Sequence, residues 1–216
     1  MKLSYAITVC NESKDLFSLV SFLLKVKDGE DEINILIDTK HVTENVKIVI
    51  EHFGNKVVTC ERDFDGNFSE HRNFHLSKCS GDYIFIIDPD EMPKEKLIRN
   101  IKSTVKDSGA DLIMIPRINI HPGFTQEWLE KSTFTVNELD WINWPDYICR
   151  VFPNTPEIKY GNELHEVIVG YKKRICLQAD PSIAIWHIKS IEKQSNRWDG
   201  EIFKSPEGDN LYDTLM

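Results

Sequence analysis

The stretch GDYIFIIDPDEMP, residues 81–93, joins an apolar segment to three carboxylates. Tyr83 to Ile87 are nearly all apolar, which predicts a buried strand. Asp88, Asp90 and Glu91 follow directly, with prolines between and after them. Acidic turns are common at strand ends, so a solvated cap is one interpretation. Carboxylate oxygens also suit magnesium and manganese, so a divalent-cation site is the other.

The sequence around this stretch predicts a parallel α/β sheet. Short apolar runs alternate with segments in which apolar residues recur at helical spacing. Strands separated by helices form a mostly parallel sheet with helices on both faces. The predicted strands are residues 3–10, 33–38, 56–60, 83–87 and 111–118.

Several positions are placed to begin or end the predicted helices. Ser13 and Ser69 suit the starts of the first and third helices. Gly54 and Gly81 are placed to end the second and third. Pro93 suits the first turn of the fourth.

Polar side chains follow the predicted strands at their carboxyl ends. Asn11 and Glu12 follow the first strand, Asp38 the second and Asp88 the fourth. Ligands of such sheets bind outside the carboxyl ends of the strands. The sequence therefore predicts a ligand crevice at this edge and favours the cation site.

The second half of the chain has a weaker pattern. Residues 119–146 are rich in Trp, Phe, Asn and Pro without clear periodicity, which predicts a long lid-like loop. YICRVF, VIVG and SIAIWH predict shorter strands that return to the sheet, and the charged last 25 residues are expected on the surface.

Composition and charge restrict the class of protein. The 216 residues are 41% hydrophobic and 28% charged, as in an ordinary one-domain globule. The net charge of −9 argues against nucleic-acid or anionic-membrane partners. The five cysteines are scattered and odd in number, which indicates neither a disulfide framework nor a zinc site. With no signal-like N-terminus and no long apolar run, we expect a cytoplasmic protein without a membrane span.

Ordinary nucleotide-binding signatures are missing: the chain has neither a G-x-x-x-x-G-K-[ST] loop nor a G-x-G-x-x-G after the first strand. A phosphate ligand would therefore need a metal bridge.

The context of Asp88-Pro89-Asp90 resembles the family-2 glycosyltransferases of the GT-A fold. In that family an Arg-Asn pair opens a helix, Gly-Asp follows, and an apolar strand runs into Asp-x-Asp, as in FSEHRNFHLSKCSGDYIFIIDPDE (68–91). AITVCNES (6–13) and ILIDTK (35–40) resemble the family's first two strands, although the second Asp, Gly and Ser of the latter loop are missing. The resemblance is good over residues 3–118 and looser beyond.

The resemblance implies a metal site and a nucleotide-sugar site. Asp90 would be the direct ligand of Mn²⁺ or Mg²⁺, Asp88 would meet the ribose or a metal-bound water, and His187 of IAIWHIKS would complete the shell. From the residues alone, a satisfied strand-end residue is the favoured interpretation of His187, and a solvated helix residue is an equal alternative for Arg72. The residues implied to contact the nucleotide-sugar are Thr8, Cys10, Asn11, Glu12, Asp38 near uracil, Arg72 at the diphosphate, Asp88 and Pro89.

The resemblance also implies a catalytic base. RVFPNTPEIKYGNELHEVI (150–168) resembles a family segment with a His-Glu pair, which makes Glu166 the candidate. Glu163 and Asp146 remain open alternatives. Trp128, Trp141 and Trp144 either stack on a sugar or anchor the long loop. The remaining histidines are interpreted as surface or packing residues, namely His41, His52, His71, His75 and His121.

Together these features predict a metal-dependent, inverting glycosyltransferase that moves a sugar from a UDP-sugar to an acceptor hydroxyl. One GT-A domain would span residues 1–216, with a nucleotide-sugar half at 3–118 and an acceptor half at 119–216. UDP is only the commoner choice over GDP or dTDP. The alternative is a nucleotide-sugar or glycan-binding protein without turnover. A phosphohydrolase is disfavoured, because its D-x-D typically ends the first strand and is soon followed by Thr.

Overall fold

A computed structural model describes residues 1–163 and 165–198. Within these residues nine strands form a central sheet in the order β3-β2-β1-β4-β7-β6-β11-β5, with β10 beside β6. The strands are β1 Leu3–Val9, β2 Glu32–Asp38, β3 Val58–Arg62, β4 Tyr83–Ile86, β5 Glu91–Pro93, β6 Leu112–Ile120, β7 Ile142–Pro153, β10 Arg174–Cys176 and β11 Ile185–Ile188.

The sheet is mostly parallel, as the alternating pattern predicts. Strands β3, β2, β1 and β4 are parallel neighbours, and β6 is parallel to β10 and β11. The exceptions are β7, which runs antiparallel between β4 and β6, and β5, which runs antiparallel to β11.

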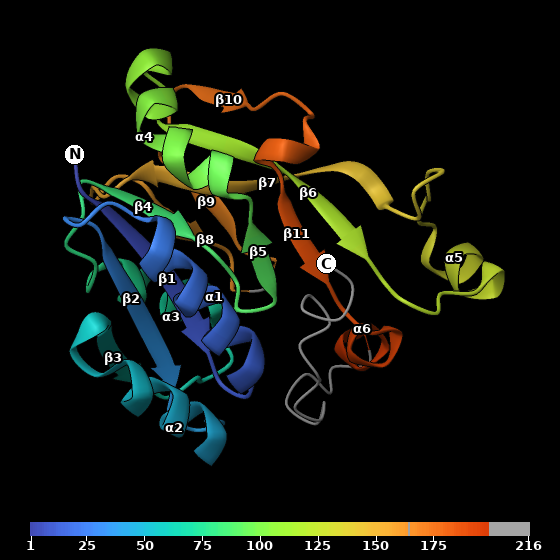
Figure 1. The fold of residues 1–216 in the computed structure, drawn as a ribbon, viewed down its shortest axis with the longest axis horizontal. Coiled ribbons are helices and arrows are strands. Elements are labelled where there is room, and N and C mark those ends of the chain that lie inside the picture. The colour runs from blue at the N-terminus through green and yellow to red at the C-terminus, as the bar shows by residue number, and fades with distance from the viewer. Residues whose placement is uncertain (164, 199–216) are drawn as a thin grey trace.

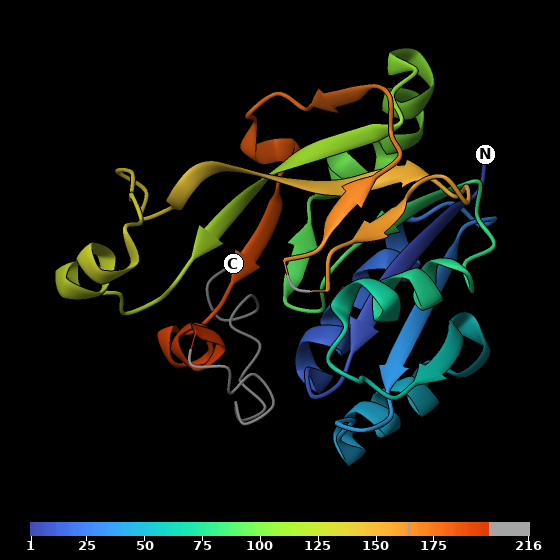
Figure 2. The same ribbon diagram turned by 180° about the vertical axis from the view of Figure 1, so that it is seen from behind.

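Helices cover both faces of the sheet (Figures 1 and 2). On one face, the apolar sides of α1, α2 and α4 pack against β1 and β2 in the main hydrophobic core. On the other face, α3 packs beside a hairpin of β8 and β9. Burial on both faces explains why β1 and β4 are almost continuously apolar. These elements are α1 Ser13–Val26, α2 Glu44–Phe53, α3 Phe68–Leu76, α4 Glu95–Ser108, β8 Lys159–Gly161 and β9 Val167–Val169.

Two of the predicted helix boundaries are confirmed. α1 begins at Ser13, although its cap residue is Glu12. α2 ends at Phe53 and Gly54 caps it, as predicted; its φ of 52° suits a residue without a side chain, and a 3₁₀ turn, Gly54–Lys56, follows.

Three predicted boundaries are wrong. Asn67, not Ser69, caps α3 by accepting a hydrogen bond from Glu70 N, and α3 ends at Leu76. Gly81 lies at the start of β4, where an added Cβ would lie 2.6 Å from Ser4 N, so close backbone approach explains this glycine. Pro93 belongs to β5, an edge strand that tolerates a residue without an N–H.

The predicted long loop at 119–146 is shorter and more ordered than expected. β6 extends to Ile120, α5 spans Gln126–Ser132 and β7 begins at Ile142. The segment VIVG contributes β9, which within residues 1–163 and 165–198 pairs only with β8 and so does not return to the central sheet. After a 3₁₀ turn at Pro181–Ile183 and β11, α6 spans Ile191–Trp198, and the rest of the expected surface tail lies outside the described residues.

Across the described part of the chain, no helix combines the length and the apolar character needed to cross a membrane.

Candidate active site

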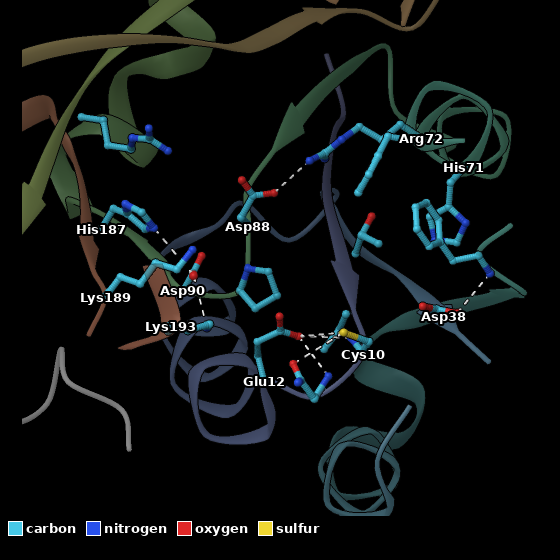
Figure 3. A pocket seen from close by; sticks show the side chains of 17 residues that line it. Cys10, Glu12, Asp38, His71, Arg72, Asp88, Asp90, His187, Lys189 and Lys193 are labelled. Carbon is cyan, nitrogen blue, oxygen red and sulfur yellow. Dashed lines mark hydrogen bonds and ion pairs between the residues drawn. The ribbon is translucent and has the colours of Figure 1, made fainter. Parts of the chain in front are cut away.

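A pocket of about 210 Å³ lies at the carboxyl ends of β1, β2 and β4, the edge predicted for a ligand. Figure 3 shows Asp90, His187, Lys189 and Lys193 on one side and Asp38 and His71 on the other, while Asp88 lies between them and Arg72 points to it from the His71 side. The lining residues fall into two named groups and a remainder. The charged end consists of Asp88, Asp90, Arg72, Arg117, His187, Lys189 and Lys193, and the aromatic end consists of Asp38, Phe64, Phe68 and His71. The remaining lining residues are Thr8, Val9, Cys10, Asn11, Glu12 and Pro89.

Asp88 is held between two arginines. Its Oδ1 lies 3.4 Å from Arg72 Nη2, and its Oδ2 lies 2.7 Å from Arg150 Nη2. Burial opposes ionisation of Asp88, but the guanidinium groups of Arg150 and Arg72 outweigh this effect and hold its pKa well below the ordinary value. Asp88 is therefore a carboxylate at neutral pH.

Glu91, the third carboxylate of the opening stretch, has a structural position. It is 1% exposed, and its Oε2 accepts a hydrogen bond of 3.1 Å from Asp88 N. Its Oε1 contacts both Arg150 and Arg117 Nη1, the latter at 3.1 Å. Glu91 thus fixes the turn of Asp88 to Asp90 and holds two arginines beside it.

Asp90 and His187 face each other, as a shared metal site requires. His187 Nδ1 lies 2.8 Å from Asn119 Oδ1, and an amide oxygen only accepts, so Nδ1 carries the ring proton. The amide is oriented by its Nδ2, which donates to Asp146 Oδ2 at 2.9 Å. His187 Nε2, 3.7 Å from Asp90 Oδ2, is then free of a proton in the neutral ring.

This donor set fits a hard divalent ion with few protein ligands. Mg²⁺ in particular binds through one or two carboxylates and leaves positions for water and substrate phosphate, and imidazole suits transition metals. Burial lowers the pKa of His187 and so favours the neutral ring, although the Asp90 carboxylate acts in the opposite direction. Over residues 1–163 and 165–198 no cluster of three or more His, Cys, Asp and Glu is arranged to hold a metal.

A lysine of α6 also reaches Asp90. Lys193 Nζ lies 3.2 Å from Asp90 Oδ2 and 3.8 Å from Asp15 Oδ2. Burial opposes ionisation of Asp90, but Lys193 and then His187 outweigh it and place its pKa well below the ordinary value. The charged end therefore has a protein-borne cation beside the expected metal ligand.

The Arg-Asn pair of α3 performs two tasks. Arg72 points to Asp88 (Figure 3). It also binds Glu166, with Nε 2.8 Å from Oε1. Asn73 donates to Tyr160 O and accepts from Tyr160 N, both at 2.8 Å. The pair thus joins the pocket to β8, in the second half of the chain.

The loop after β1 is organised by Glu12. Its Oε2 accepts hydrogen bonds of 3.1 Å from the backbone N–H groups of Cys10 and Asn11. Burial, followed by the Glu12 carboxylate, raises the pKa of Cys10, so its thiol stays protonated. Thr8 Oγ1 contacts His75 Nδ1 at 3.3 Å. Each residue predicted from this loop lines the pocket, but its role stays a prediction.

Asp38 lies at the aromatic end and is well bonded within the protein. Its Oδ1 accepts from Lys40 N and Phe64 N, both at 3.1 Å, and its Oδ2 contacts His41 Nδ1 at 2.6 Å. Beside it, the rings of Phe64 and Phe68 lie 4.6 Å apart and line the pocket.

The three candidate bases differ in position. Glu166 binds Arg72 and is partly buried. Asp146 contacts Arg117 Nη2 at 2.6 Å and Asn119, which makes it a support of the His187 ring. Glu163 accepts a hydrogen bond of 3.2 Å from Phe68 N through its backbone oxygen. None of the three lines the pocket.

The tryptophans of the second half pack into clusters. Trp128 is 9% exposed and lies with Leu129 and Ile142 in a small core, so it anchors α5. Trp141 lies 5.2 Å from Trp144 and 5.9 Å from Trp186 between ring centroids.

Sequence reasoning missed several pocket residues. It assigned no role to Phe64, Phe68, Arg117, Lys189 and Lys193, and it interpreted His71 only as a surface or packing residue. The position of His71 directly before Arg72, at the start of a helix that meets the strand ends, was the one available signal.

Comparisons with known proteins point to one family. The model of the family described as "Glycosyl transferase family 2" matches residues 4–160. Glycosyltransferase GlyG of Streptococcus pneumoniae serotype 4 is 28% identical over 115 residues, which cover 52% of this chain and 38% of GlyG.

Solved structures agree at the level of the fold. S. aureus TarS superposes with a TM-score of 0.62 at 15% identity, covering 88% of this chain and 37% of that one. TarS 1–349 in complex with UDP-GlcNAc gives a TM-score of 0.62 at 16% identity, covering 88% of this chain and 59% of that one. The GT-A fold is confirmed, and the matched region covers only 38% of GlyG and 37% of the TarS chain.

Proposed function

The chain belongs to glycosyl transferase family 2, and on that premise we propose that it moves a sugar from a UDP-sugar to an acceptor hydroxyl in a metal-dependent, inverting reaction. The observation that carries the proposal is the charged end of the pocket, where Asp90 and His187 face each other beside Arg72 and Asp88. The complexes of TarS with UDP-GlcNAc and with UDP support the choice of nucleotide.

Asp90 and His187 would hold Mn²⁺ or Mg²⁺. Such an ion, when bound, offsets the negative charge of the diphosphate as it leaves. Asn119 and Asp146 keep the His187 ring turned toward Asp90. Supporting partners of this kind orient the ligands of a metal and raise its affinity.

The chain's own cations would bind the rest of the diphosphate. Arg72 lines the pocket and already contacts Asp88, while Lys189 and Lys193 line it beside Asp90 and His187 (Figure 3). These side chains counter the net charge of −9 locally, which an anionic donor requires. The fixed guanidinium of Arg72 suits recognition of a diphosphate oxygen pair.

Glu166 is the base that we propose for the acceptor hydroxyl. It comes from the second half of the chain and lies beside Arg72, where acceptor and donor would meet. Inversion follows from a single displacement: the acceptor oxygen bonds to the anomeric carbon opposite the diphosphate, the carboxylate takes the hydroxyl proton, and the diphosphate leaves with the electron pair of the broken bond. The division into a nucleotide-sugar half and an acceptor half stays a prediction, as does a cytoplasmic location, which the five free cysteines support.

The test is nucleotide binding with and without metal. A ligand of the folded state raises its stability by mass action, so a thermal-shift titration of UDP with and without Mn²⁺ reports both affinities. We expect Mn²⁺ to strengthen UDP binding at least ~10-fold in the wild type. Asp90→Asn should remove this gain without unfolding the protein.

Asp107→Asn, at an exposed position of α4, is the matched control and should keep the full effect of Mn²⁺. A wild-type protein that binds UDP equally with and without divalent ions would contradict the metal part. Release of UDP from a panel of UDP-sugars, measured with acceptor sugars, then tests turnover. Donor binding with no transfer to any acceptor would indicate a binding protein.

A further inference from the structure

His71 is a buried imidazole that faces the pocket without a partner. It lies on α3, is 4% exposed and lines the aromatic end. Among the described residues neither its Nδ1 nor its Nε2 has a hydrogen-bond partner. Figure 3 shows its ring on the side of Asp38, away from Asp90 and His187.

Other buried histidines of the chain are satisfied. His75, one turn later on α3, contacts Thr8 Oγ1 at 3.3 Å and Asn34 O at 3.2 Å. His121 Nδ1 lies 2.9 Å from Lys189 O. A buried polar group without a hydrogen bond is costly, and such groups in native proteins call for an explanation. Asp31 Oδ2, Arg150 Nε and Trp186 Nε1 also lack a hydrogen-bond partner among the described residues, but of these four side chains only His71 lines the pocket, where a ligand could supply one.

The surroundings of His71 suit a flat, partly polar ring. Phe64 meets it edge-on, with centroids 5.3 Å apart and planes at 82°, and Phe68 lies next to Phe64. Burial lowers the pKa of His71, so the imidazole is neutral and offers one N–H donor and one acceptor nitrogen. Asp38 already accepts two backbone N–H groups with one oxygen, which leaves His71 with more open hydrogen-bonding capacity.

We propose that His71 hydrogen-bonds the base of the donor nucleotide, an inference that rests on the proposed function. Consecutive residues of a helix point about 100° apart. His71 and Arg72 therefore address two parts of one nucleotide, with the base at the aromatic end and the diphosphate at the charged end. A pyrimidine edge, which carries donors and acceptors side by side, matches a neutral imidazole.

The experiment compares His71→Phe with the wild type, using UDP and inorganic pyrophosphate as probes in the presence of Mn²⁺. Phenylalanine keeps the ring and removes both nitrogens. We expect UDP affinity to fall about 5- to 10-fold, the worth of one hydrogen bond, and pyrophosphate affinity to stay unchanged. The ligand-free variant should melt about 2–4 °C higher, because two unsatisfied nitrogens are gone.

His71→Gln, which retains a donor and an acceptor, should recover part of the UDP affinity and serves as the second variant. Equal UDP affinity in wild type and His71→Phe would overturn the inference while leaving the proposed function intact. Parallel losses of UDP and pyrophosphate would also overturn it, because they indicate a displaced Arg72. If the wild type binds UDP no more tightly than pyrophosphate, the base adds no affinity, and this result would contradict the proposed UDP-sugar donor itself.

Discussion

The two ends of the pocket solve the burial of polar groups in opposite ways. At the charged end, Asp88 contacts two arginines and Asp90 contacts a lysine. At the aromatic end, His71 is buried with no hydrogen-bond partner in the described part of the chain. The carboxylates of the charged end thus have cationic partners within the protein before a ligand arrives, whereas the His71 ring would gain its hydrogen-bond partner from a ligand.

This difference has consequences for binding. A diphosphate entering the charged end must compete with Asp88 and Asp90 for the same cations. These ion pairs therefore reduce the electrostatic free energy that the diphosphate gains on binding. A base that binds His71 displaces no hydrogen bond of that ring within the described residues. We therefore expect the charged end to govern stability and catalysis, and the aromatic end to govern discrimination between ligands.

The largest effect is expected for the base. Glu166→Gln keeps an oxygen that can accept from Arg72 Nε but loses the capacity to take a proton. General-base catalysis typically contributes 10²–10⁴-fold, so transfer should slow by about that factor while UDP-sugar affinity stays close to normal. Steady-state transfer rates and donor titrations measure the two quantities.

Two variants serve as comparisons for Glu166. Glu163→Gln should transfer sugar at close to the wild-type rate. Asp146→Asn should instead weaken Mn²⁺-dependent UDP binding, because Asp146 orients Asn119 and through it His187. If Glu166→Gln transfers sugar at the wild-type rate while Glu163→Gln is slow, the general base is Glu163 and not Glu166.

The second prediction concerns stability at the charged end. Arg150 is 6% exposed and lies between Asp88 and Glu91, so Arg150→Met leaves the buried Glu91 and the partly buried Asp88 short of a cation. Breaking a buried ion pair costs about 3–5 kcal/mol of the free energy of unfolding. Urea denaturation at neutral pH measures this loss.

Arg99→Met is the matched control for Arg150. Arg99 pairs with Glu95 on α4, but the two side chains are 59% and 54% exposed. An exposed pair of this kind contributes at most about 1 kcal/mol. Equal losses in the two variants would show that burial of the charged end carries no special stability.

The sequence predicts the charged end much better than the aromatic end. Asp88 and Asp90 follow an apolar strand, and Arg72 belongs to a recognisable pair, so local patterns identify them. Phe64 and His71 have no such pattern, because their place in the pocket depends on how α3 packs beside β1. From sequence alone, a histidine near the start of a helix is as typical of a surface residue as of a pocket residue.

The same contrast holds for the fold. Strands β1, β2 and β4 and the helices between them follow from hydrophobic periodicity, since each is formed by local sequence. The position of β7 between β4 and β6 does not, because antiparallel insertion depends on contacts between residues far apart in the chain. Pro93 misled the prediction for this reason, since pairing with Ile185 makes it a strand residue.

The smallest expected effect is a change in the pH dependence of stability, and it concerns His75, one turn after His71 on α3. His75 is 2% exposed, and burial lowers its pKa to about 3 from an ordinary value of 6.5. The unfolded chain therefore binds a proton between these values that the folded protein does not. The free energy of unfolding must fall as pH drops below about 6.5, by up to about 1.4 kcal/mol per pH unit from this residue.

His75→Gln, which does not titrate, should show a slope shallower by about that amount between pH 6 and 4, while the curves run parallel above pH 7. Urea denaturation across this range measures both slopes. Identical slopes below pH 6 would contradict this prediction. They would mean that His75 takes up its proton equally in the folded and unfolded chains, and so that its imidazole is more accessible to water than its burial indicates.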